Sequence, residues 1–257
     1  MIDMRGIFSH SEYADTVEKF EEYKLCEASI CRWSIFKKLH KDIAHNKCPF
    51  CETTLDTTAL NSSGTIDHFR PQAMDMYPDL KCEPKNYILM CNLCNTRYKE
   101  SKFPLVDKSK RATQAKMMEE TEEEQPLLFN PAEENPLYFF ELAFRQTEKG
   151  GILELKERKN LSKDSYAYQR SEAMINLFGL GYVNEDIHPD EEAKELRVDI
   201  LTAHYEAFIE LAQAVKKAIK TGDKKPLALF VRDKNRTEML KEYGFYQFLL
   251  NEQFDIY

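Results

Sequence analysis

No stretch of this sequence is apolar over the roughly 20 residues that a bilayer-spanning helix needs, so we expect no membrane segment. The residues that follow Met1 lack an apolar core of signal-peptide length, which argues against secretion. A glycine-rich phosphate loop, an internal repeat and a low-complexity tract are also missing, so we do not expect the chain to hydrolyse nucleotides itself. These absences predict a cytoplasmic protein.

The sequence also lacks an excess of positive charge. Its 257 residues allow one or two domains with a buried core, and the formal net charge is -8. Residues 1–111 carry 17 Lys and Arg against 16 Asp and Glu, whereas residues 112–257 carry 19 against 28. The overall charge therefore does not attract nucleic acid, and we expect any such contact in the first half of the chain.

Seven cysteines are present, and in a reducing compartment paired cysteines more often bind metal than form disulfides. Four of them form two Cys-x-x-Cys pairs, Cys48 with Cys51 and Cys91 with Cys94. Two thiolates from one tight turn can reach the same Zn²⁺, and four thiolates complete its tetrahedral coordination. We therefore predict a structural zinc site. The competing interpretations are two unrelated thiol pairs or a redox-active pair.

In the first half of the chain, the apolar spacing predicts a small set of elements. Residues 11–44 place apolar side chains three and four residues apart without Gly or Pro, which predicts one long helix or two helices with a break near 26–29. Short strands are expected at 64–69 and at 87–90, separated by a loop that contains two prolines. A helix is expected over about 91–99.

In the second half of the chain, helices are expected to dominate. The blocks of charge within 108–124 are typical of a solvated helix face or a mobile linker. Residues 137–144 and 151–156 predict two strands of a hairpin, joined through the glycines at 150 and 151. The predicted helices cover 162–178, about 190–220 and about 234–250, with breaks at 179–189 and 222–226.

The 39 residues between the two cysteine pairs contain an Asp67-His68 dipeptide, and Asn95 directly follows the second pair. Phosphodiester cleavage needs a base that activates water and a cation that neutralises charge on the phosphate. The imidazole of His68 titrates near neutral pH, whereas Asp67 and Asn95 offer the hard oxygen ligands that Mg²⁺ prefers. Neighbours on an ideal strand point to opposite faces, so Asp67 and His68 can share one phosphate only if the backbone bends there.

Together these residues resemble the signature of the HNH endonucleases, the ββα-metal family. The resemblance rests on Cys48, Cys51, Asp67, His68, Pro71, Asn86, Cys91, Cys94, Asn95 and Lys99. It implies that His68 is the general base and that Asn86 braces the loop that orients it. It also implies that Asp67 and Asn95 hold a catalytic Mg²⁺ or Mn²⁺. Asn95 replaces the final His of the family motif, and either residue can ligate the metal.

The same resemblance implies that basic residues around the motif contact phosphates. These candidates are Arg70, Arg97, Lys99 and Lys102. The alternative for each of them is a solvated surface charge. Contacts of this kind position a nucleic acid without reading its base sequence.

A closer resemblance connects the chain to the PtuB-type HNH proteins of Septu antiphage systems and of their retron-associated relatives. It rests on CPFCE, DHFRP, YPDLK at 77–81, CNxxYK, FPL at 103–105 and PLLFNP at 126–131. The family pairs its nuclease with an ABC/SMC-like ATPase of the PtuA type, which implies such a partner here. Gln72 departs from the Lys that often follows the proline of the DHFRP motif.

We therefore expect an α+β protein in three parts. These are a helical arm over 1–46, a zinc-stapled ββα core over 47–106 and a mainly helical, partner-binding region over 107–257. The expected function is cleavage of DNA by a metal-dependent endonuclease in antiphage defence. The alternatives are a nuclease that cleaves RNA, such as tRNA, and a non-catalytic zinc-binding adaptor of an ATPase complex.

Overall fold

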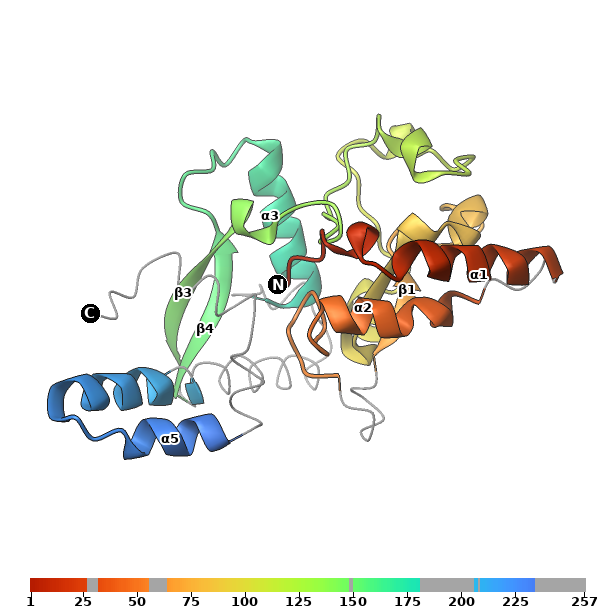
Figure 1. Ribbon diagram of the computed structural model, residues 1–257. Coiled ribbons are helices and arrows are strands. Elements are labelled where there is room, and N and C mark those ends of the chain that lie inside the picture. Colours follow the sequence, from red (N-terminus) through yellow and green to blue (C-terminus); the bar gives the residue numbers. More distant parts are fainter. Residues whose placement is uncertain (27–31, 56–63, 148–149, 181–205, 208, 234–257) are drawn as a thin grey trace.

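The computed structural model describes the chain apart from residues 27–31, 56–63, 148–149, 181–205, 208 and 234–257 (Figure 1). Within the described residues it is a mixed α and β structure with two separate two-stranded antiparallel sheets and a helical C-terminal half. The part of the chain so described has no helix that is both long and apolar enough to cross a bilayer. The helix predicted at 234–250 and most of that predicted at 190–220 lie outside the described residues.

The N-terminal region forms two helices, α1 (Tyr13–Cys26) and α2 (Lys37–Ile43), and a short 3₁₀ turn, η2 (Trp33–Phe36), leads directly into α2. Of the two predicted possibilities, two helices rather than one continuous helix is the observed arrangement. Phe20 of α1 and Phe36 of η2 both pack against the ring of Tyr87, with ring centroids 5.8 Å and 5.4 Å away. The arm therefore covers the first sheet.

The first sheet pairs β1 (Thr65–His68) with β2 (Tyr87–Met90), as the two short apolar runs predict. The register places His68 opposite Tyr87 and Thr65 opposite Met90. All four residues of β2 are buried, whereas burial alternates along β1 and leaves Thr65 and Asp67 partly exposed. The predicted helix comes next as η5 (Leu93–Lys99), a π-helix.

The connector, which we define as residues 106–125, leaves the core and returns to it. Leu105 forms an isolated bridge with Pro126, and the Val106 amide donates a 3.0 Å hydrogen bond to the Gln125 carbonyl. Its buried residues recur at every third position and are Ala115, Met118, Thr121 and Glu124. This three-residue period turns one side of the segment inward, while Glu119, Glu120, Glu122 and Glu123 are exposed, as expected of a solvated face.

The second sheet is the predicted hairpin, formed by β3 (Phe140–Thr147) and β4 (Gly150–Glu157). The predicted helix after it is α3 (Tyr166–Phe178), which begins at a Ser165 cap and ends at Gly179, whose φ of 61° is left-handed. Figure 1 shows α3 alongside this hairpin.

At its C-terminal end α3 reaches the first cysteine pair. The ring of Phe178 stacks on that of Phe50, which lies between Cys48 and Cys51, with centroids 4.6 Å apart and planes 22° apart. This contact joins the second half of the chain to the predicted zinc region.

The last described elements are a helix over 209–221 and α5 (Lys225–Arg232). The sequence predicts a break at 222–226, yet α5 starts inside it. Pro226 occupies the first turn of α5, where a helix tolerates proline because that backbone nitrogen has no intrahelical acceptor.

The remaining short elements connect these helices and strands. They are η1 (Ile7–Ser9), η3 (Pro78–Cys82), η4 (Pro84–Asn86), η6 (Lys108–Lys110), η7 (Met118–Thr121) and η8 (Pro136–Tyr138).

Candidate functional site

The four paired cysteines form one buried cluster. Cys48, Cys51, Cys91 and Cys94 place their sulfur atoms within 4.8 Å of one another, and the sulfurs of Cys51 and Cys91 are 3.6 Å apart. Zn–S bonds of about 2.3 Å would set tetrahedral sulfurs about 3.8 Å apart, so the spacing suits such an ion. These residues can therefore bind a metal such as zinc, as the sequence predicts.

Two local structures create this cluster. In the first pair, the Cys48 amide donates to the Thr53 carbonyl at 2.9 Å, and the Glu52 amide donates to the Cys48 carbonyl at 2.8 Å. In the second pair, Cys91 comes directly after β2, and the Cys94 amide donates to the Cys91 sulfur at 3.3 Å. Each Cys-x-x-Cys segment is thus a turn that directs two sulfurs to the same point.

The electrostatics of the cluster favour a cation. The pKa of the Cys91 thiol is raised well above its usual value, first by hydrogen bonding with Cys48, and burial similarly raises the pKa of Cys94. Four thiolates in such a buried space would repel one another, whereas a divalent cation at their centre stabilises the deprotonated form.

His68 ends β1 and is held by its surroundings. Its Nε2 lies 2.9 Å from the carbonyl of Lys81, which also accepts a hydrogen bond from the Tyr87 hydroxyl at 2.9 Å. A carbonyl can only accept, so Nε2 carries the proton and Nδ1 is the basic nitrogen. The rings of Trp33 and Tyr87 contact the imidazole edge to face, at 5.2 Å and 5.4 Å.

This environment keeps the imidazole neutral. His68 is only 3% exposed. Burial lowers its pKa, an effect that the hydrogen bond to the Lys81 carbonyl partly opposes. The ring is therefore a neutral base at physiological pH, with little of its surface open to solvent.

Asn86 ties together the loop between β1 and β2. Its side-chain oxygen accepts from the Arg70 amide at 2.7 Å, and its side-chain nitrogen donates to the carbonyls of Arg70 and Leu80 at 3.0 Å and 3.2 Å. Leu80 directly precedes Lys81, whose carbonyl holds His68. A single fully buried amide thus joins the residues after His68 to the segment that orients its ring.

The opposite side of β1 faces η5. The ammonium of Lys99 donates to Asp67 Oδ2 at 2.9 Å and to the His68 carbonyl at 2.8 Å. The side-chain amide of Asn95 donates to the Thr65 hydroxyl at 2.9 Å, which leaves its oxygen available as a ligand. Asp67 and Asn95 therefore lie on the same side of β1, as a shared cation would require.

The ladder continues without interruption through His68, so Asp67 and His68 lie on opposite sides of the strand. These two side chains could meet at one phosphate only through a backbone bend, and β1 contains none.

Two of the four predicted phosphate contacts are buried. Lys99 is 1% exposed with three internal acceptors, and Arg70 is 5% exposed with its guanidinium against Glu124. Neither side chain offers a surface to a phosphate in this structure. Arg97 and Lys102 are exposed and stay predictions.

Several residues that shape the site are missed by sequence reasoning. The ring neighbours Trp33 and Tyr87 come from elements that are distant from β1 in the sequence, and the Lys81 carbonyl leaves no signal in a sequence. Cys82, the residue after Lys81, is disulfide-bonded, which the predicted reducing compartment does not lead one to expect.

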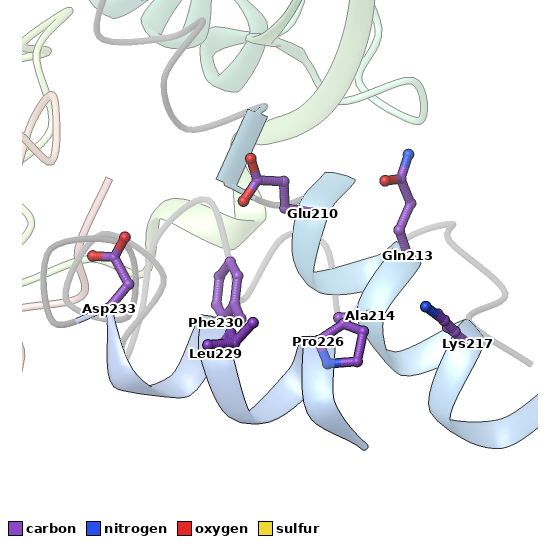
Figure 2. A pocket seen from close by; sticks show the side chains of 8 residues that line it. All are labelled: Glu210, Gln213, Ala214, Lys217, Pro226, Leu229, Phe230 and Asp233. Carbon is purple, nitrogen blue, oxygen red and sulfur yellow. The ribbon is translucent and has the colours of Figure 1, made fainter. Parts of the chain in front are cut away.

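A separate pocket of about 590 Å³ lies between the helix over 209–221 and α5 (Figure 2). Its lining residues are Glu210, Gln213, Ala214, Lys217, Pro226, Leu229, Phe230 and Asp233. None of them belongs to the predicted site, and the lining has no cysteine or histidine.

No protein-family model, curated protein or solved structure matches this chain. A function therefore has to be argued from the geometry around β1, β2 and η5.

Proposed function

We propose that this protein is a metal-dependent endonuclease of the ββα-metal type, which hydrolyses phosphodiester bonds in DNA. One observation carries the proposal. A two-stranded hairpin and the helical turn that follows it adjoin a buried four-cysteine cluster. The first strand of the hairpin carries a neutral histidine and an aspartate, and the helical turn carries an asparagine on the same side of that strand as the aspartate.

In this mechanism His68 is the general base. Its Nδ1 takes a proton from the attacking water, and the protonated Nε2 stays on the Lys81 carbonyl, which fixes the ring orientation. The lowered pKa of His68 keeps the base unprotonated at neutral pH. Asn86 is a positioning residue, since its amide holds the loop that carries the Lys81 carbonyl.

Asp67 and Asn95 would hold the catalytic Mg²⁺ or Mn²⁺ on the η5 side of β1, and the backbone at His68 would have to bend on substrate binding for this cation and the imidazole to reach one phosphate. When bound, such a cation neutralises the negative charge that develops on the phosphate. Lys99 already compensates the charge of Asp67 from the same side. Zinc on the four cysteines would be structural, because all four ligand positions are taken by protein.

A partner completes the proposal. Residues 112–257 carry 19 basic and 28 acidic residues, a composition more suited to a protein contact than to nucleic acid. By the resemblance of its motifs, the chain would act in antiphage defence under an ABC/SMC-like ATPase supplied in trans.

The test is a cleavage assay with the full chain on plasmid DNA, single-stranded DNA and total RNA, with Mg²⁺ or Mn²⁺ and with or without the ATPase. His68→Ala should abolish cleavage while zinc content and fold persist. His10→Ala, which replaces a histidine of the N-terminal segment, is the matched control. Undiminished cleavage by His68→Ala would refute the assignment, and cleavage of RNA alone would replace DNA as the substrate.

A specific observation favours a second candidate, a non-catalytic zinc-binding adaptor. His68 is almost fully buried, it faces away from Asp67, and Asp67 is already paired with Lys99. An adaptor would cleave no substrate even with its partner, and His68→Ala would leave its biological activity intact. The same assays therefore separate the two functions.

A further inference from the structure

Arg70 and Glu124 form a buried ion pair between the loop after β1 and the connector. Arg70 Nε lies 3.2 Å from Glu124 Oε2, and the two side chains are 6% and 1% exposed. The guanidinium also lies over the rings of Phe103 and Tyr77, at 5.2 Å and 5.8 Å. A buried charge left without its partner is strongly unfavourable, so this pair fixes where both segments lie.

The carboxylate of Glu124 collects donors from two further places. Its Oε1 accepts from the Tyr77 hydroxyl at 2.8 Å and from the Ala112 amide at 2.7 Å. Arg111, the residue before Ala112, donates to the same Tyr77 hydroxyl at 3.2 Å. One carboxylate thus holds the loop after β1, the start of η3 and the first part of the connector.

This junction is continuous with the His68 environment. Arg70 is two residues from His68, and both its amide and its carbonyl are bonded to Asn86. Tyr77 directly precedes η3, the short turn that contains Lys81 and hence the carbonyl that holds the His68 ring. Through Arg70 and Tyr77, the side chain of Glu124 therefore contacts both chain segments that determine the orientation of the imidazole.

We propose that Glu124 is a positioning residue for His68. Through Glu124, the position of the connector determines the orientation of the imidazole that acts as the catalytic base. The inference rests on the proposed nuclease function and names a regulatory contact of that same site. A partner that displaces the connector would withdraw the carboxylate from Arg70 and Tyr77 and release the His68 loop. The connector is suited to this task because its ends meet at the core while its outer face, with Glu119 and Glu120, is exposed.

The experiment compares Glu124→Gln with Glu123→Gln, its exposed neighbour, in the zinc-loaded full chain. The first readout is the ¹⁵N NMR signal of histidine side chains, with His68 assigned from the spectrum of His68→Gln. Glu124→Gln should move the His68 ring signals, and Glu123→Gln should leave them in place. The second readout is cleavage, where Glu124→Gln should lower kcat by about 10- to 100-fold with a much smaller change in KM, as misplacement of a catalytic group does.

Two further variants keep the test decisive. Tyr77→Phe removes one hydrogen bond from Glu124 and should move the His68 signals in the same direction by a smaller amount. The double variant Arg70→Gln/Glu124→Gln should cleave no more slowly than the slower single variant, because both changes break one link.

Unmoved His68 signals in Glu124→Gln and Tyr77→Phe would overturn the inference, as would equal shifts in Glu123→Gln. If the wild-type chain cleaves nothing, the proposed function fails, yet the NMR comparison still decides whether Glu124 orients His68.

Discussion

Replacing Lys99 with Met tests the interior of the candidate site most directly. The ammonium of Lys99 bonds to Asp67 Oδ2 at 2.9 Å, to the His68 carbonyl at 2.8 Å and to the Glu100 carbonyl at 3.4 Å. Methionine fills a similar volume without charge or donors. The variant therefore leaves a carboxylate and two carbonyls without the cation that now satisfies them.

The expected loss of stability depends on the burial of the pair. Removing one partner of a fully buried ion pair costs about 3–5 kcal/mol. The side chain of Asp67 is 20% exposed, so water can replace part of the lost interaction, and we expect a loss of about 2–3 kcal/mol. For a chain of this size that corresponds to a fall in Tm of roughly 4–12 °C.

The assay is thermal unfolding of the zinc-loaded protein, with Lys102→Met as the control. Lys102 is three residues away with its side chain 51% exposed, and its substitution should shift Tm by less than about 2 °C. Lys99→Met should also bind Mn²⁺ more tightly than the wild type, because Asp67 no longer has an internal cation. An unchanged Tm would refute the ion-pair reasoning, and weaker Mn²⁺ binding would argue against Asp67 as a metal ligand.

The remaining predictions concern the cysteine cluster and His40. Cys91→Ser should lose bound zinc and unfold the region around β1 and β2, because structural zinc contributes folding free energy directly. Zinc analysis together with circular dichroism measures both effects. A variant that is folded but free of zinc would contradict this prediction. Burial lowers the pKa of His40 to about 3 in the folded protein. In the unfolded chain the same imidazole binds a proton below about pH 6.5, so protonation favours the unfolded state and the stability falls as the pH decreases. Between pH 7 and pH 5 the free energy of unfolding should fall by about 2 kcal/mol from this effect. His40→Leu should therefore flatten the pH dependence of the stability measured by urea unfolding. An unaltered pH dependence in this variant would show that His40 does not cause it.

The part of the site predicted from the sequence is the part that local patterns determine. The two Cys-x-x-Cys pairs predict the cluster because each pair is one turn, and short apolar runs predict β1 and β2. Contacts between distant residues are not visible in such patterns. Arg70 and Glu124 are 54 positions apart, so nothing near Arg70 indicates that it is buried and paired rather than free for phosphate.

The buried positions of the connector are also difficult to predict from the sequence. Its acidic residues are numerous enough to hide the three-residue period of its buried positions, and only the packed structure reveals that one glutamate, Glu124, turns inward. At the start of α5, Pro226 predicts a break although proline also begins helices, and only the packing of the residues after it distinguishes the two cases. The roles of His68, Asp67, Asn86 and Asn95 stay predictions until cleavage is measured.

The stack of Phe50 on Phe178 has a consequence for biosynthesis. Phe50 lies inside the first Cys-x-x-Cys turn, while Phe178 ends α3, so this turn acquires its packing partner only after 128 further residues have been translated. At about 5–20 residues per second, that interval is roughly 6–25 s. Until Phe178 has been made, the turn that carries Cys48 and Cys51 lacks the aromatic neighbour that it has in the complete structure.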